Sequence, residues 1–238
     1  MTDERLIVAL DYHDLESPKK LVAELGDAVD WYKVGMELYY RVGSDIVTWL
    51  EGQGKHVFLD LKLHDIPATV GGGLCSLMNL GADIVNVHAG GGYTMMKTAC
   101  DMVHEAAAKQ GIEPPKIIAV TVLTSINDED WEQLGLDMPI KSVVLRLAKL
   151  AQKAGLDGVV ASPQEASIIR EACGPDFLIV TPGVRPAGSD ANDQSRIATP
   201  SQALKNGSSH LVIGRPIRAA EDPRAVALAI LKEMETVK

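Results

Sequence analysis

The chain contains little cysteine and no long apolar run. Its three cysteines, Cys75, Cys100 and Cys173, are widely spaced and form no CxxC pair. An odd number of isolated cysteines argues against a disulfide framework and a structural zinc site, and a reducing cytoplasm is the expected location. No segment approaches the ~20 apolar residues of a membrane-spanning helix, and the acidic N-terminus carries no export signal. We therefore expect neither a structural metal nor a membrane partner.

Positive charge is also scarce. The chain has 23 Lys and Arg against 32 Asp and Glu, for a formal net charge of −9. Binding to nucleic acid or to an acidic membrane requires a basic face that neutralises phosphates, which this composition does not provide. We expect no nucleic-acid partner, and any anionic small molecule must be bound by a few local cations.

Eight short apolar runs alternate with amphipathic stretches along the chain. The predicted strands cover residues 6–10, 31–35, 56–62, 84–89, 117–123, 158–162, 178–184 and 211–214. This alternation is typical of parallel α/β folds, and 238 residues with 46% hydrophobic content suit one barrel. The sequence predicts a single-domain (β/α)₈ TIM barrel over residues 1–238, with a doubly wound open sheet as the alternative.

Helix boundary signals support the alternation. Ser17-Pro18 supplies a predicted N-cap and first helical residue, and Gly26 is placed to end that helix. Asp222-Pro223 similarly predicts the start of the last helix.

Three charges lie at the end of the third predicted strand. Because strand side chains alternate, Asp60 and Lys62 share one face, and Asp65 lies just past the strand end. An unpaired buried charge is strongly unfavourable. These residues therefore predict either a self-compensating salt-bridge cluster or a functional array of anion, cation and anion.

Other polar residues follow the remaining strands. In a (β/α)₈ barrel the active site lies at the carboxyl ends of the strands, and this set comprises Asp11, Lys33, His88, Thr124, Ser125, Arg185 and Arg215. A functional interpretation is favoured for Asp11 and Lys33. They come from two further strands and are expected at the same end of the barrel as Asp60 and Lys62. His88 is better interpreted as a satisfied core histidine.

Two segments that combine glycine with arginine predict a phosphate site. Barrels of this type often bind phosphate in the loops after strands 7 and 8, where residues 181–185 and 214–217 contain Arg185 and Arg215. Glycine permits close backbone approach, and arginine binds phosphate oxygens through a planar fork. The polar segment 185–199 is predicted to be an active-site lid. The expected ligand is a phosphorylated small molecule, with two surface arginines beside turn glycines as the alternative.

Five motifs together resemble one enzyme family. They are Leu6-Ile7-Val8-Ala9-Leu10-Asp11, Lys33-Val34-Gly35, Asp60-Leu61-Lys62-Leu63-His64-Asp65-Ile66-Pro67, Thr181-Pro182-Gly183-Val184-Arg185 and Val212-Ile213-Gly214-Arg215-Pro216-Ile217. With these motifs the whole chain resembles the bacterial type of orotidine 5′-phosphate decarboxylase. The resemblance implies conversion of orotidine 5′-monophosphate to uridine 5′-monophosphate (UMP) and CO₂ in de novo pyrimidine synthesis, without metal or organic cofactor.

The resemblance also implies a role for each site residue. Lys62 protonates C6 of the pyrimidine as CO₂ leaves, Asp60 faces the substrate carboxylate, and Lys33 lies next to Asp60. Asp65 and Thr69 are contributed across the interface of a homodimer with shared active sites. The other implied contacts are Asp11 and Lys33 with the ribose, Thr124 and Ser125 near the pyrimidine, and Arg185, Gln194, Gly214 and Arg215 with the phosphate.

Two other functions remain open. Enzymes that resemble hexulose-phosphate synthase or ketogulonate-phosphate decarboxylase use a related Asp-x-Lys-x-x-Asp strand with Mg²⁺. The continuation Asp65-Ile66-Pro67 and the presence of Gln194 favour the pyrimidine enzyme. A sensor of phosphorylated ligands that has lost catalysis is the alternative from another class, and the intact Lys62 with its carboxylates argues against it.

Overall fold

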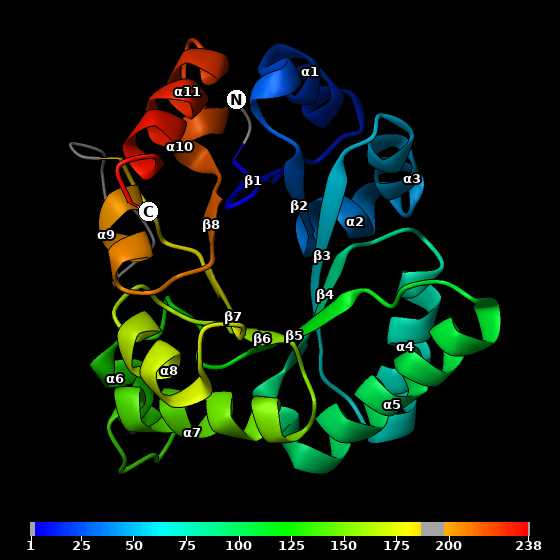
Figure 1. The fold of residues 1–238 in the computed structure, drawn as a ribbon, viewed down its shortest axis with the longest axis vertical. Helices are drawn as coiled ribbons and strands as arrows, with labels where there is room; N and C mark the ends of the chain where they lie inside the picture. The colour runs from blue at the N-terminus through cyan, green and yellow to red at the C-terminus, as the bar shows by residue number, and fades with distance from the viewer. Residues whose placement is uncertain (1–2, 187–197, 238) are drawn as a thin grey trace.

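The computed structural model describes residues 3–186 and 198–237 and contains a closed barrel of eight parallel strands. Neighbouring strands follow the order of the sequence, and β1 pairs with β8 to complete the ring (Figure 1). The strands are β1 Leu6–Ala9, β2 Trp31–Gly35, β3 His56–Leu63, β4 Ile84–His88, β5 Lys116–Val120, β6 Gly158–Val160, β7 Leu178–Thr181 and β8 His210–Ile213. The predicted (β/α)₈ barrel is confirmed, and the open sheet is wrong.

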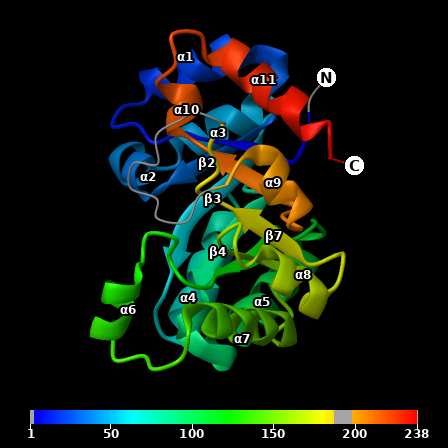
Figure 2. The same ribbon diagram turned by 90° about the vertical axis from the view of Figure 1, so that its left-hand side faces the viewer.

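Helices surround the barrel and connect its strands (Figures 1 and 2). They are α1 Glu16–Leu25, α2 Met36–Val42, α3 Asp45–Gly52, α4 Pro67–Met78, α5 Gly92–Gln110, α6 Asp128–Gln133, α7 Ile140–Lys153, α8 Ala166–Cys173, α9 Pro200–Lys205, α10 Arg215–Arg218 and α11 Pro223–Met234, with short 3₁₀ helices at Gly26–Ala28 and Ala89–Gly91. Within the described ranges, none of these helices has the length and apolar character to cross a membrane.

The first helix begins earlier than its sequence predicts. It starts at Glu16 rather than after Ser17, because Asp14 accepts hydrogen bonds from both the backbone N–H and the hydroxyl of Ser17, each at 2.7 Å. Ser17 therefore lies inside the first turn and does not cap it. Gly26 ends this helix with a φ of 57°, as predicted.

The start of the last helix agrees with the sequence. Helix α11 begins at Pro223, and the Asp222 side chain accepts a hydrogen bond from the backbone N–H of Ala225 at 2.9 Å. This is the N-cap geometry that the Asp-Pro pair predicts.

The barrel interior contains a small apolar cluster with polar side chains at one end. The cluster comprises Ile7, Ala9, Phe58, Ile84, Ile118, Val180 and Val212. Because side chains alternate along a strand, the next inward positions of the first four strands are Asp11, Lys33, Asp60 and Asn86. The inward face thus changes from apolar to polar toward the carboxyl ends of the strands.

Strand β3 is irregular near those ends. Against β4 it pairs Leu59 with Val85 and then Leu63 with Val87, so the register shifts between these pairs. Lys62, within the irregular part, has a φ of 52° and is the one non-glycine residue with positive φ in the described ranges. Such bulges bend a strand and redirect its side chains, and they are frequent beside active sites.

Candidate active site

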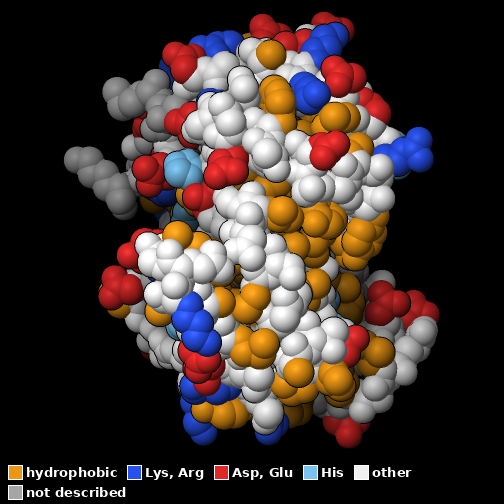
Figure 3. Space-filling view, turned by 90° about the vertical axis from the view of Figure 1, so that its right-hand side faces the viewer, with side chains coloured by type: hydrophobic (Ala, Val, Ile, Leu, Met, Phe, Trp, Pro, Cys, Tyr) orange, Lys and Arg blue, Asp and Glu red, His pale blue; other side chains and the backbone are white. Residues whose placement is uncertain are grey.

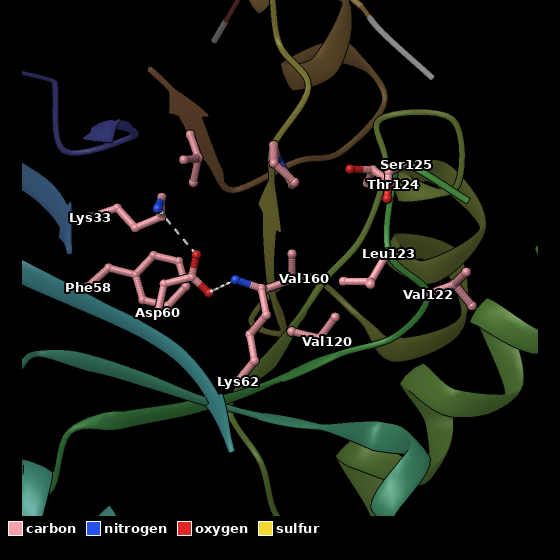
Figure 4. Close-up of a pocket in the computed structure, with 12 residues that line it drawn as sticks. Lys33, Phe58, Asp60, Lys62, Val120, Val122, Leu123, Thr124, Ser125 and Val160 are labelled. Atoms are coloured by element: carbon pink, nitrogen blue, oxygen red, sulfur yellow. Dashed lines mark hydrogen bonds and ion pairs between the residues drawn. The ribbon is translucent and has the colours of Figure 1, made fainter. Parts of the chain in front are cut away.

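Three charged side chains from β2 and β3 form a buried array at the carboxyl end of the barrel. Asp60 Oδ1 lies 2.7 Å from Lys62 Nζ, and Asp60 Oδ2 lies 3.4 Å from Lys33 Nζ. Lys33 Nζ also contacts Asp11 Oδ1 at 3.1 Å. Figure 4 shows the two lysines on different sides of Asp60. The array alternates anion and cation from Asp11 to Lys62.

The two lysines keep Asp60 ionised despite its burial. Asp60 is only 7% exposed. Burial raises the pKa of its carboxyl, but the charges of Lys33 and Lys62 and the hydrogen bonds from Lys62 and Asn86 outweigh burial, so the pKa lies below its ordinary value. The site therefore contains a fixed negative charge beside two ammonium groups.

Lys33 is held in its charged form by the same network. Burial lowers the pKa of this ammonium, while Asp60 and Asp11 raise it, and the net pKa lies above its ordinary value. Gly35, two residues further along β2, makes room for the Lys33 side chain, because a Cβ at this position would lie 2.8 Å from Lys33 Nζ. The Lys33-Val34-Gly35 motif thus has a steric basis.

The charge array forms one wall of a cavity of about 270 Å³. Its lining combines charged, hydroxyl and apolar side chains: Lys33, Phe58, Asp60, Lys62, Val120, Val122, Leu123, Thr124, Ser125, Val160, Pro182 and Val212. Figure 4 shows Thr124 and Ser125 on the wall away from Asp60. This cavity presents charges on one side and hydroxyl groups on another, with apolar walls between them.

A second, smaller cavity of about 170 Å³ carries the arginines. Its lining is Ala9, Asp11, Lys33, Pro182, Gly183, Arg185, Val212, Gly214, Arg215 and Arg218. Lys33, Pro182 and Val212 line both cavities. The two cavities are therefore neighbouring parts of one site, one with the lysine–aspartate array and one rich in guanidinium groups.

Most of the sequence-predicted residues meet at this site. The two cavities bring together Asp11, Lys33, Asp60, Lys62, Thr124, Ser125, Arg185, Gly214 and Arg215. Asp65 and Thr69 are exposed and line neither cavity of their own chain. Gln194 and most of the predicted lid 185–199 lie outside the described residues.

Other side chains complete the site without having been singled out in the sequence. Asn86 donates to Asp60 Oδ1 at 2.7 Å and is almost fully buried. Arg218 lines the smaller cavity and stacks its guanidinium on the Tyr12 ring, 5.2 Å from the ring centroid. An asparagine inside an otherwise apolar strand is the one sequence signal that could have indicated Asn86.

His88 lies near the array but lines neither cavity. Its ring centroid is 5.4 Å from that of His64. Burial lowers the pKa of His88, and the nearby His64 and Lys62 lower it further. His88 is thus half-buried, its lowered pKa favours the neutral imidazole, and its interpretation as a core histidine stays a prediction.

The fold and the site define a class of protein: a (β/α)₈ barrel with a buried lysine–aspartate array and an arginine-rich cavity at the carboxyl ends of its strands. The family model for the orotidine 5′-phosphate decarboxylase / HUMPS family matches residues 4–230. The chain belongs to this family.

Individual relatives support the same assignment. The chain is 52% identical to orotidine 5′-phosphate decarboxylase of Moorella thermoacetica, with 99% of this chain and 94% of the relative covered. It is 50% identical to the enzyme of the same name from Carboxydothermus hydrogenoformans, covering 98% and 97%. A crystal structure of the Lactobacillus acidophilus orotidine 5′-phosphate decarboxylase superposes with a TM-score of 0.85 at 45% identity, covering 98% and 99%.

Proposed function

We propose that this protein decarboxylates orotidine 5′-monophosphate to UMP in pyrimidine biosynthesis. The observation that carries the proposal is the contact of 2.7 Å between Lys62 and the buried, ionised Asp60 in the wall of the larger cavity. An ammonium held there is a proton donor beside a fixed negative charge. Two curated relatives that bear the name of this activity match the chain over 94% and 97% of their own length.

The two cavities suggest how the nucleotide lies. Arg185 and Arg215 in the smaller cavity would bind the phosphate dianion through charge-assisted hydrogen bonds. The pyrimidine would occupy the larger cavity, near Thr124 and Ser125. Asp11 and Lys33 lie at the junction, where the ribose hydroxyls would lie.

Lys62 would supply the proton that replaces CO₂. As the bond between C6 and the carboxylate carbon breaks, its electron pair stays on C6, because no adjacent carbonyl can accept it. The Lys62 ammonium stabilises this developing carbanion and then transfers a proton to C6, leaving a neutral amine that regains its proton from water. Preorganised charges of this kind are effective because they need no reorganisation during the reaction. No metal or organic cofactor enters this step.

Asp60 would contribute in two ways. It holds the Lys62 ammonium in place at 2.7 Å, and its negative charge would lie beside the substrate carboxylate. Repulsion between the two carboxylates disfavours the bound substrate and disappears as neutral CO₂ forms. We rank stabilisation by Lys62 above this repulsion.

A homodimer would complete each site with Asp65 and Thr69 of the neighbouring copy. Both residues follow β3 on the exposed surface, and their own cavities do not include them. Exposed apolar residues also follow the ends of β2, β3 and β4, namely Met36, Tyr40, Ile66 and Tyr93, with Tyr40 73% and Ile66 67% exposed. Figure 3, which views the side with α3, α4 and α5, shows apolar side chains gathered across that face. Exposed apolar groups of this kind often mark an interface.

The proposal includes segment 185–199 as an active-site lid, and the contacts at its two ends support this. Val184 forms an isolated bridge with Ala198, and the Arg185 N–H donates to the Ala198 carbonyl at 3.0 Å. These contacts join the two ends of the segment at the arginine-rich cavity. Binding energy from the remote phosphate can then speed the reaction if it closes this segment over the substrate.

A direct assay tests the proposed activity. Pure protein incubated with orotidine 5′-monophosphate should remove the substrate absorbance and release one CO₂ per UMP, equally well with and without a chelator. Loss of activity with chelator and recovery with Mg²⁺ would instead indicate the Mg²⁺-dependent relatives. Substrate binding without turnover would favour the sensor.

A further inference from the structure

Asn86, in the middle of β4, contacts both members of the Lys62–Asp60 pair. Its Nδ2 donates to Asp60 Oδ1 at 2.7 Å, and its Oδ1 accepts from the backbone N–H of Lys62 at 2.7 Å. A carboxylate can only accept and a backbone N–H can only donate, so these two partners determine the orientation of the amide. The side chain is 1% exposed and lines neither cavity.

Asn86 lies opposite the irregular part of β3. The pairs Leu59 with Val85 and Leu63 with Val87 leave residues 60–62 of β3 facing the single residue Asn86 of β4. Within this bulge Lys62 adopts a φ of 52°, a conformation that is unfavourable for a non-glycine residue and persists only where its surroundings hold it. The Asn86 carbonyl oxygen bonds the Lys62 N–H at this point and thereby holds that conformation.

The amide nitrogen of Asn86 restrains the carboxylate as well. Asp60 Oδ1 accepts hydrogen bonds from both Asn86 Nδ2 and Lys62 Nζ at 2.7 Å, while Oδ2 lies 3.4 Å from Lys33 Nζ. The carboxylate is therefore restrained at both oxygens. Without Asn86, Oδ1 would be restrained by the flexible Lys62 side chain alone.

We infer that Asn86 is a positioning residue, which fixes the main chain of Lys62 and the carboxylate of Asp60 so that the proton donor keeps one geometry. This inference rests on the proposed decarboxylation. Asn86 acts through its two neighbours and does not touch the substrate. Its removal should therefore lower kcat while leaving nucleotide binding intact, since the arginine-rich cavity is unchanged.

Kinetics of Asn86→Ala test this role. A misplacement of about 1 Å at a reacting group lowers the rate by about 10²-fold, so kcat should fall by about that factor while the Kd for UMP stays within about threefold. Ser208→Ala is the matched control, because Ser208 is also buried and pairs with the Thr181 hydroxyl at 2.7 Å, outside both cavities. It should lose stability but keep kcat.

Asn86→Asp provides a readout that a purely structural role would not change. This variant keeps an acceptor for the Lys62 N–H but brings a second carboxyl against Asp60, and two such carboxyls share a proton. The protonated form can donate to Asp60 Oδ1 as the amide does. The ratio of kcat for Asn86→Asp to kcat for Asn86→Ala should therefore rise as the pH falls.

Three results would overturn the inference. They are a folded Asn86→Ala variant with kcat within about twofold of the wild type, a kcat ratio that does not change with pH, and a crystal structure of Asn86→Ala in which the Lys62 φ and the contact between Lys62 Nζ and Asp60 are unchanged. The crystal structure needs no turnover. It therefore tests Asn86 separately from the proposed function, which fails if the wild type leaves orotidine 5′-monophosphate intact.

Discussion

The two ends of the barrel use polar side chains differently. At the amino end, three side chains lie just before even-numbered strands, and each accepts a hydrogen bond from the main chain of the preceding strand. The pairs are Asp83 with the Val57 N–H, Asp157 with the Ile117 N–H and Ser209 with the Ile179 N–H, at 2.7 to 2.8 Å. These side chains supply hydrogen-bond acceptors to backbone N–H groups where the strands begin.

At the carboxyl end, the polar side chains contact one another across a cavity. Asp60 accepts from the side chains of Lys62 and Asn86 and contacts Lys33, and all but Asn86 line the larger cavity. The same residue types thus stabilise strand pairing at one end and remain available to a ligand at the other. This matches the general division of a (β/α)₈ barrel into an end that supports stability and an end that supports function.

Two lysine–aspartate pairs offer the sharpest test of this division. Lys62–Asp60 at the carboxyl end and Lys116–Asp157 at the amino end have N–O distances of 2.7 and 3.0 Å. Lys62→Ala should lower kcat by about 10⁴-fold, because the proton donor is lost, while UMP binding persists in a calorimetric titration. Lys116→Ala should leave kcat unchanged. A Lys62→Ala variant with near-normal turnover would remove Lys62 from its proposed role.

Mixed dimers test whether each active site at the carboxyl end contains residues of a second copy of the chain. Lys62→Ala and Asp65→Ala should each be nearly inactive alone. If two chains of an isologous dimer share sites, a one-to-one mixture should recover about a quarter of the wild-type activity, since half of the dimers carry one intact site. Activity is measured after unfolding and refolding the mixture together. Mixed dimers that form and show no recovery would contradict the shared site.

Arg215→Ala tests the phosphate part of the same end. Loss of charge-assisted hydrogen bonds worth about 1.5–3 kcal/mol should lower kcat/KM by about 10- to 150-fold. Arg215→Lys should recover only part of this loss, because lysine keeps the charge but lacks the planar fork. Steady-state kinetics give both values. Equal activity of the lysine variant and the wild type would argue against fork recognition.

Asp157→Ala should affect stability rather than catalysis. The change leaves the Ile117 N–H without its side-chain acceptor and removes the partner of Lys116. An unsatisfied buried backbone donor costs about 1–3 kcal/mol, so denaturant unfolding should show a loss of that size. Turnover of the folded fraction should equal that of the wild type. A fall in kcat would mean that the two ends are coupled.

The pH dependence of stability provides the smallest test. Since the pKa of folded Asp60 is depressed, its ionisation stabilises the fold above the unfolded pKa of about 3.9, and this contribution is lost as the pH falls through the folded pKa. In that acidic window the wild type should lose up to about 1.4 kcal/mol per pH unit relative to Asp60→Asn. Unfolding titrations of both proteins check the difference. Parallel curves would contradict the depressed pKa.

The barrel and most of the site could be predicted from local sequence patterns. Alternation put Asp60 and Lys62 on one face, and the glycine–arginine segments after strands 7 and 8 indicated the arginine-rich cavity. Strand ends were less accurate: β5 ends at Val120 rather than at residue 123. Val122 and Leu123 line the cavity instead of continuing the strand, and apolar composition does not distinguish these two environments.

Asn86 shows why other parts of the site could not be predicted. An asparagine in an apolar strand has many possible partners, and its actual partners lie on β3. Its contacts with Lys62 and Asp60 depend on a register shift between two strands. The prediction of Ser17 as the N-cap was wrong for a related reason. The nearby Asp14 side chain accepts hydrogen bonds from the N–H and the hydroxyl of Ser17.

The sequence by itself determined the eight strands, their alternation with helices and the face on which each charge lies, because these follow from the period of a single strand or helix. Only the tertiary structure decided which atoms meet. The closure of β1 against β8, the contacts of Lys33 with Asp11 and Asp60, and the left-handed Lys62 held by Asn86 all depend on register between strands. Register is a property of paired strands, and no single segment contains it.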